Sequence, residues 1–259
     1  MGVRASAPIC WIDIEGGIRN SSVWDFSIVF EPPPPANITA TRVLNFQTPS
    51  QAKRVKNSVP PGLYKSMLPN ETWELSYTHT KDGKWNLDSS IKVPNGTSLI
   101  DVVRARLPSN STVAAWNMMA HDAKILKHMM PTDNMTLRDP LRFFRKHINL
   151  PFNTLGSNKK GTPRDVMKAG TYSELGGAHT SLVDCLHMRD VTIKAAYAVH
   201  RAFKTQSDID IDDVHNKSDA EYYAALLATV FKKPDKTQVD SSAQTHGDPW
   251  MWTSFYWDG

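Results

Sequence analysis

Two acidic residues near the start of the chain have the spacing of a metal site. Asp13 and Glu15 stand two positions apart in WIDIEGG, residues 11–17, which is otherwise apolar. In a β-strand both side chains would point to the same face, roughly 6–7 Å apart. Burying two like charges is costly unless a cation neutralises them, and Mg²⁺ prefers carboxylate oxygens. The pair therefore predicts a divalent-metal site, with a strand end at which both acids reach water as the alternative.

Two further acids and a histidine occur at positions that suit the same site. Asp122 lies at the start of an expected helix that follows a buried strand, and Asp184 lies in the first turns of another. His179 precedes Asp184 by five residues, which turn a helix by about 500°, so the two would not share a helical face. We therefore expect His179 on the loop ahead of that helix. Four carboxylates and a histidine are the groups that two-metal hydrolysis of a phosphodiester uses.

The segments that carry these residues resemble a known group of enzymes. WIDIE, AWNMMAHDAKIL and HTSLVD are similar, in order and spacing, to the three motifs of the DEDDh (DnaQ-like) 3′–5′ exonuclease superfamily. The first motif is most similar to that of oligoribonuclease, whereas the second motif and the proline-rich segment resemble the three-prime repair exonucleases. The resemblance covers about three-quarters of the chain. It implies an α/β fold with an RNase H-like mixed β-sheet flanked by α-helices.

The resemblance also implies an activity and the residues that perform it. The activity is removal of nucleoside 5′-monophosphates from the 3′ end of single-stranded DNA or RNA. His179 is implied to be the general base. Two Mg²⁺ or Mn²⁺ ions are implied to bind four carboxylates, which belong to Asp13, Glu15, Asp122 and Asp184.

Four other residues match positions that contact the substrate in this superfamily, and a fifth stands beside one of them. Gly16, Gly17 and Ile18 occupy the place where the terminal nucleotide binds, although this segment is one residue shorter than the usual motif. Asn117 matches a polar residue that approaches the substrate. Trp116, beside it, is placed either to stack on a base or to pack in the core.

Length and composition predict the organisation of the chain. The 259 residues, 40% hydrophobic and 22% charged, fit one large globular domain. We expect the exonuclease domain at residues 1–205, with an insertion at about 31–97 that holds loops and short helices or strands. Residues 206–259 are expected to add a helix and an aromatic tail packed on the same domain. Early strands followed by helices favour a mixed α/β sheet covered by helices.

Charge and composition leave several partners open. The net charge of +4 permits nucleic-acid binding without requiring it. Two basic clusters are candidates for phosphate contacts, with solvated surface charge as the alternative. Relatives are often dimers, so a homodimer is one open option, and the proline-rich loop and the aromatic tail are candidate sites for a protein partner. The basic clusters are Lys53, Arg54 and Lys56, and Lys159, Lys160 and Arg164.

The expected compartment is intracellular, either cytoplasm or nucleus. No stretch of the sequence approaches a membrane span, no signal-peptide pattern begins the chain, and Cys10 and Cys185 suggest no disulfide framework. Two alternative functions remain open. One is a nuclease-like module that binds nucleic acid or a partner with little catalysis. The other is a membrane-tethered interaction protein, because MGVRAS matches a myristoylation pattern.

Overall fold

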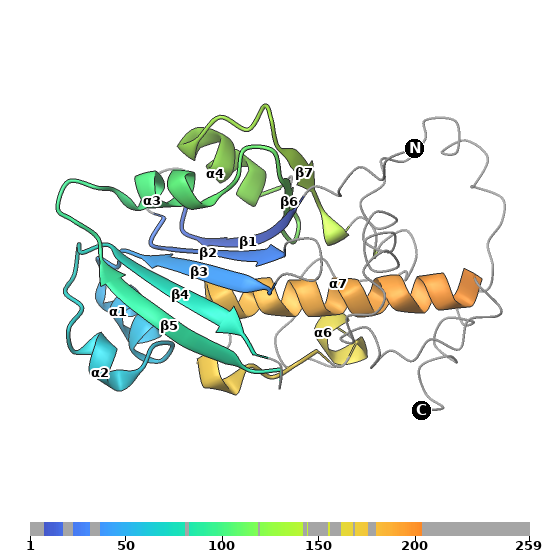
Figure 1. The fold of residues 1–259 in the computed structure, drawn as a ribbon, viewed down its shortest axis with the longest axis horizontal. Coiled ribbons are helices and arrows are strands. Elements are labelled where there is room, and N and C mark those ends of the chain that lie inside the picture. The colour runs from blue at the N-terminus through green and yellow to red at the C-terminus, as the bar shows by residue number, and fades with distance from the viewer. Residues whose placement is uncertain are drawn as a thin grey trace.

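The computed structural model describes residues 8–17, 23–31, 37–80, 83–118, 120–141, 144, 155, 162–167, 169–175 and 180–203. These residues form a seven-stranded mixed β-sheet with helices on both faces (Figure 1). The predicted α/β fold with a mixed sheet flanked by helices is confirmed. Within the described ranges, none of the helices combines the length and hydrophobicity that crossing a membrane requires.

Five strands form the antiparallel part of the sheet, each antiparallel to the next. The first of them is the strand expected to carry Asp13 and Glu15. The last three lie inside the expected insertion and extend the same sheet, and the alternating side chains of WELSYTH bury one apolar face of β4 in the core. In chain order the five are β1 (Ile9–Glu15), β2 (Asp25–Glu31), β3 (Thr39–Leu44), β4 (Trp73–His79) and β5 (Trp85–Lys92).

Two short strands, β6 (Thr112–Ala114) and β7 (Thr136–Arg138), complete the sheet in the order β5-β4-β3-β2-β1-β6-β7. β6 is parallel to β1 and pairs with its first half, Ile9–Trp11. The pairing ends before Asp13. The second half of β1 is therefore flanked on this side by the chain that follows β6.

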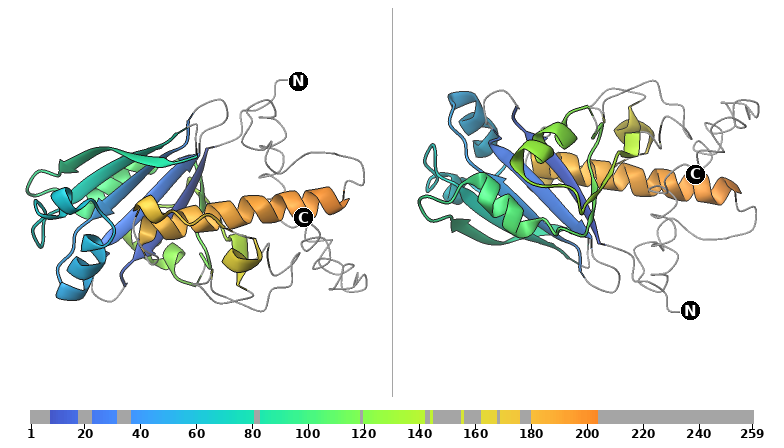
Figure 2. Two further views of the ribbon diagram at one scale, coloured as in Figure 1. Left: turned by 90° about the horizontal axis from the view of Figure 1, so that it is seen from below. Right: turned by 90° about the horizontal axis from the view of Figure 1, so that it is seen from above.

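Helices cover both faces of the sheet (Figure 2). α7 (Ser181–Phe203), α1 (Pro49–Lys56) and α2 (Pro61–Tyr64) pack on one face, and α7 extends past the edge of the sheet. α3 (Leu99–Arg106) and α4 (Asp122–Met129) pack on the other face. The short helix α6 (Pro163–Val166) and the 3₁₀ turn η2 (Ser173–Leu175) precede α7 along the chain.

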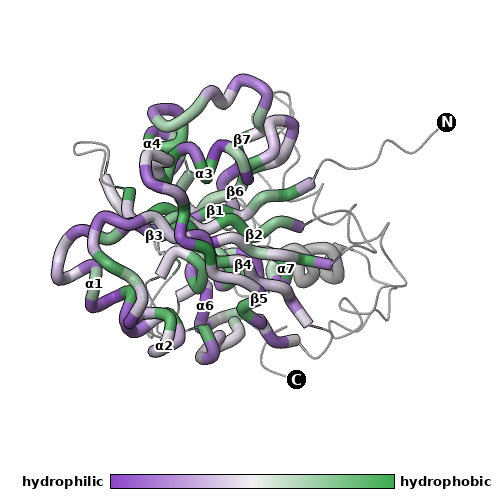
Figure 3. Tube along the Cα trace, turned by 60° about the vertical axis from the view of Figure 1, so that its left-hand side comes forward, coloured by the Kyte–Doolittle hydropathy of each residue, from purple (hydrophilic) through white to green (hydrophobic). Residues whose placement is uncertain are grey.

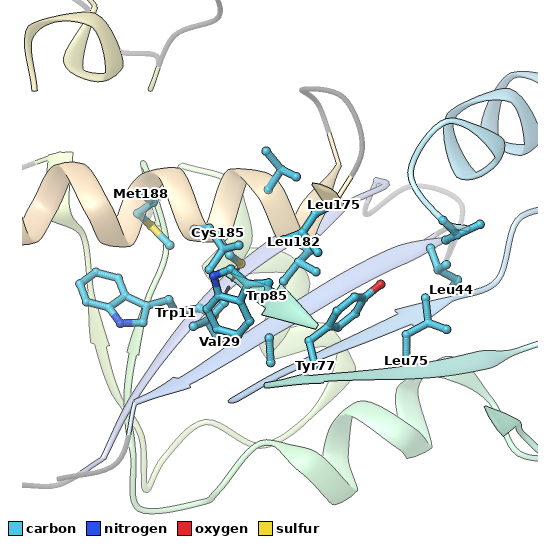
Figure 4. Packing of buried hydrophobic residues seen from close by; sticks show 14 of the residues in the cluster. Trp11, Val29, Leu44, Leu75, Tyr77, Trp85, Leu175, Leu182, Cys185 and Met188 are labelled. Atoms are coloured by element: carbon cyan, nitrogen blue, oxygen red, sulfur yellow. Dashed lines mark hydrogen bonds between the residues drawn. The ribbon is translucent and has the colours of Figure 1, made fainter. Parts of the chain in front are cut away.

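The alternation of side chains along β1 divides the core in two. Trp11 points toward α7 and packs with Cys185 and Met188 (Figure 4). Ile12 and Ile14 point the other way, into the layer formed with α3 and α4. In Figure 3, green hydrophobic stretches run through β1 and β2, whereas purple hydrophilic stretches mark α1. The face of β1 that carries Asp13 and Glu15 is therefore the face that α7 covers.

Local sequence signals fix the ends of α1 and α3. Thr48 accepts the backbone N–H of Gln51, and the Gln51 side chain accepts the N–H of Thr48, which forms a capping box. Ser98 and Asp101 form the same arrangement at α3. The last turn of α1 carries three basic side chains, which suit the negative end of the helix dipole.

Several predictions concern residues outside the described ranges. These are the four prolines at 32–35, the N-terminal MGVRAS and residues 206–259. The proposed domain boundaries, the partner sites in these segments and the homodimer remain predictions.

Candidate metal centre

Three of the four predicted acids converge on one point between β1 and α7. Asp13, Glu15 and Asp184 each offer a carboxylate oxygen, and these oxygens lie within 4.8 Å of one another. All three residues are half-buried. Asp184 lies in the first turn of α7, directly over the face of β1 that carries the other two. We call these residues the acidic trio; their oxygens could together hold a divalent cation.

Asp122 lies beside the acidic trio and is more deeply buried. It is the first residue of α4 and is 4% exposed. Its carboxylate accepts a backbone hydrogen bond from Ile14, next to the strand position of Asp13. Its Oδ1 has no hydrogen-bond partner among the described residues. A buried carboxylate oxygen without a partner is costly, and a cation or water would relieve that cost.

Burial and mutual repulsion raise the pKa of each acid on β1. The pKa of Asp13 lies well above its usual range because of burial first, and then because of the charges of Asp184 and Asp122. Burial also raises the pKa of Glu15 to about 7. The guanidinium of Arg54 acts in the opposite direction on Glu15. Without a cation, Glu15 therefore remains partly protonated near neutral pH.

The pKa of Asp122 is also raised, to about 7. Burial is the main cause, and the charge of Asp139 adds to it. The hydrogen bond from Ile14 opposes the rise. The acids of this site thus come from both faces of the sheet, and burial and the charges of neighbouring acids raise the pKa values of Asp13, Glu15 and Asp122.

A buried carboxylate on β2 fixes the first turn of α7. Asp25 accepts hydrogen bonds from the hydroxyl and the backbone N–H of Ser181, the latter at 3.4 Å. Arg42 binds the same carboxylate through Nε at 2.9 Å and Nη2 at 2.7 Å. The hydroxyl of Ser27 lies 2.6 Å from that of Ser181. This network sets the position of Asp184, three residues further along the helix.

A second ion pair holds α7 near the other end of β2. Arg189 donates to the Glu31 carboxylate through Nε at 3.0 Å and Nη2 at 2.8 Å. The indole N–H of Trp11 donates to the same group at 2.8 Å. The first and last residues of β2 thus bind α7 on either side of Asp184, so the helix can neither slide nor rotate freely on the sheet.

One buried histidine lies next to the trio. The Nδ1 atom of His187 is 3.9 Å from Oδ1 of Asp184, and its Nε2 is 2.9 Å from the carbonyl oxygen of Gly170. The N–H of Gly170 donates to Asp190 at 2.7 Å. His187 and Asp190, both on α7, therefore bind the carbonyl oxygen and the N–H of Gly170. These contacts anchor the segment that precedes the helix.

Two arginines flank the acidic trio. Nη1 of Arg54, on α1, lies 3.2 Å from Oε2 of Glu15. Arg164, on α6, is half-buried, and burial lowers its pKa while the charge of Asp184 opposes that effect. Both arginines belong to the basic clusters recognised in the sequence.

The structure places four of the predicted substrate-contact and base residues and leaves two outside the described ranges. Gly16 has φ of 148°, a conformation that L side chains rarely adopt, and Gly17 follows it in open space. Asn117 has φ of 56° and donates its N–H to Asp139 at 3.0 Å. Trp116 is half-buried, with its ring edge-on to Phe144 at 5.2 Å. The two outside are His179 and Ile18.

Three residues important to this site were not singled out for it from the sequence. Asp25 had a signal, since a single carboxylate in the β-rich segment VWDFSIVF must find a partner when buried. Arg54 appeared only as part of a basic cluster, and its contact with Glu15 depends on how α1 packs. Asp139 follows β7 and reaches Asn117 across the sheet end, which no local pattern indicates.

Comparison of the chain with protein-family models, with curated proteins and with solved structures yielded no match.

Proposed function

We propose that the protein is a metal-dependent 3′–5′ exonuclease of the DEDDh type, with an RNase H-like sheet. Its reaction is hydrolysis of phosphodiester bonds at the 3′ end of single-stranded DNA or RNA, with release of nucleoside 5′-monophosphates. The observation that carries the proposal is the convergence of Asp13, Glu15 and Asp184, whose carboxylate oxygens lie within 4.8 Å of one another. These acids lie up to 171 positions apart in the sequence and come from two different elements, a strand and a helix.

The residues fit the ions that this chemistry uses. The donor set consists of carboxylate oxygens, which Mg²⁺ and Mn²⁺ prefer. Asp122 adds a buried oxygen without a partner among the described residues, and burial, together with the charges of neighbouring acids, raises the pKa values of Asp13 and Glu15. We assign the acidic trio and Asp122 as the residues that hold two ions. When bound, such ions supply a hydroxide nucleophile at neutral pH and stabilise the leaving oxygen.

The protein's own groups position the reaction. Asp13 would be one of the ligands, because its carboxylate oxygen lies within 4.8 Å of those of Glu15 and Asp184. Asp25 and Arg189 hold α7 so that Asp184 faces β1. His179 is proposed to accept the proton of the attacking water, as the general base. Contacts with the terminal nucleotide are proposed for Gly16, Gly17, Ile18, Asn117 and Trp116.

The test is digestion of matched DNA and RNA oligonucleotides labelled at the 5′ end, with Mg²⁺, with Mn²⁺ and with EDTA. The wild type should shorten the labelled oligonucleotide stepwise from its 3′ end only when metal is present. Asp13→Ala and Asp184→Ala should lower the rate about 100-fold or more while the protein remains folded. Asp88→Ala, which removes an exposed carboxylate from the edge strand β5, is the matched control and should cut at the wild-type rate.

Two outcomes would contradict the proposal. Digestion by Asp13→Ala at the wild-type rate would show that the site is elsewhere. Binding of oligonucleotides without metal uptake or cleavage would instead favour the alternative, a nuclease-like binding module.

A further inference from the structure

The basic end of α1 meets the acidic trio. Lys53, Arg54 and Lys56 lie in the last turn of this helix and are exposed. Arg54 reaches across to β1, where Nη1 lies 3.2 Å from Oε2 of Glu15. The Arg54 side chain is 48% exposed and that of Glu15 is 22% exposed, so solvent reaches the pair. This contact brings a positive charge to a proposed metal ligand.

A rigid ring supports Arg54 from below. The guanidinium lies over the ring of Trp24, 5.9 Å from its centroid, in a cation–π arrangement. Trp24 is 6% exposed, and its backbone N–H donates to the carbonyl of Glu15 at 3.1 Å. The platform under Arg54 is therefore fixed to the end of β1. It would stay in place if the ion pair with Glu15 opened.

Arg54 and a bound cation would compete for the carboxylate of Glu15. The carboxylate of Glu15 belongs to the acidic trio and also faces Arg54. A divalent cation at the trio would neutralise this carboxylate and repel the guanidinium, so the Arg54–Glu15 attraction would weaken. A planar guanidinium with five donors, held over an aromatic ring, is then well suited to bind a phosphate.

We propose that Arg54 binds a backbone phosphate of the nucleic-acid substrate. Its guanidinium becomes free to do so when a divalent cation binds the carboxylate of Glu15. This inference rests on the proposed function, and it names the contact by which that site would hold the substrate's backbone. Lys53 and Lys56 extend the positive charge along the same edge. In this arrangement Arg54 couples substrate binding to the presence of metal.

The first test uses no metal and therefore does not depend on catalysis. Binding of a fluorescent single-stranded oligonucleotide is measured in EDTA for the wild type, Glu15→Gln, Arg54→Ala and the double variant. Glu15→Gln should strengthen binding about tenfold, because it frees Arg54. In the Arg54→Ala background the same change should strengthen binding less than about twofold, and this difference is the coupling between the two residues.

The second test uses the enzyme with Mg²⁺ and a series of salt concentrations. Arg54→Ala should raise KM about tenfold and change kcat less than about threefold. The slope of log affinity against log salt should fall by about one, as expected for one lost phosphate contact. Arg54→Lys should recover part of the affinity. Lys127→Ala, which removes an exposed positive charge from α4 on the opposite face of the sheet, is the control and should change KM less than about twofold.

Specific results would overturn the inference. They are an equal gain in binding from Glu15→Gln with and without Arg54, an unchanged KM in Arg54→Ala, or a rise in KM in Lys127→Ala as large as that in Arg54→Ala. A wild type that cuts nucleic acid normally alongside any of these results removes only the role of Arg54. A wild type that neither takes up Mn²⁺ nor cuts removes the proposed function, whereas the EDTA experiment still reports on the coupling between Arg54 and Glu15.

Discussion

Asp25 and Ser181 are joined by two hydrogen bonds, although 156 positions separate them in the chain. Asp25 begins β2 and Ser181 begins α7, so the carboxylate caps the helix from the neighbouring layer. Arg42 neutralises the same carboxylate, and both charged side chains are fully buried. The helix turn that carries Asp184 is thereby fixed to the sheet.

Replacing Asp25 with alanine should destabilise the protein strongly. Arg42 would keep a buried charge without its partner, and the first turn of α7 would lose its cap. We expect the free energy of unfolding, from urea titration, to fall by about 3–5 kcal/mol. A double variant, Asp25→Leu with Arg42→Leu, leaves no buried charge and should lose less. A loss below about 1 kcal/mol in Asp25→Ala would mean that the ion pair does not carry this role.

Asp122→Asn should stabilise the protein in EDTA at pH 8 while it abolishes cleavage. Burial raises the pKa of Asp122 from 3.8 to about 7, so folding is penalised once this group ionises. We expect a gain of about 1–3 kcal/mol in the free energy of unfolding at pH 8. At pH 5 the folded protein already protonates Asp122, so the gain should shrink. A variant that is less stable than wild type at both pH values would contradict this account.

Metal binding should release protons near neutral pH. The pKa of Glu15 and that of Asp122 are both raised to about 7, and these groups must lose their protons to act as ligands. Calorimetry of Mn²⁺ binding in buffers of different ionisation enthalpy should show release of about one to two protons at pH 6, and almost none at pH 9. The affinity should therefore rise between these pH values. Binding without proton release at pH 6 would show that these carboxyls are not ligands.

Gly16 and Gly17 offer a matched pair of substitutions. Gly16 has φ of 148°, whereas a Cβ at Gly17 would meet no heavy atom within 4 Å. Gly16→Ala should therefore cost about 1–3 kcal/mol through backbone strain. Gly17→Ala should change the free energy of unfolding by about 0.5 kcal/mol or less. Equal effects in urea titrations would refute the assigned strain at Gly16.

Much of the central sheet could be predicted from local patterns. The strand expected to carry Asp13 and Glu15 is β1, because an apolar strand with two acids on one face has few other solutions. The predicted starts of the two helices that carry Asp122 and Asp184 are also confirmed. These positions follow from periodicity and from prolines that end neighbouring segments.

Other features depend on contacts between distant segments. β4 and β5 extend the sheet because Trp73 and Tyr77 join the core under α1 and α7, and a window of polar and turn residues does not reveal this. The cap on α7 comes from Asp25 rather than from a residue beside the helix. The contact between Arg54 and Glu15 spans 39 positions. Such pairings are set by topology, which local sequence does not encode.

The most direct test of the central claim is titration of the protein with Mn²⁺ at pH 8, with free Mn²⁺ followed by electron paramagnetic resonance. The account predicts that the wild type takes up Mn²⁺ and that Asp184→Asn weakens this uptake about tenfold or more, while Asp88→Asn has no effect. Equal uptake by the wild type and a variant lacking all three carboxylates of the acidic trio would contradict it.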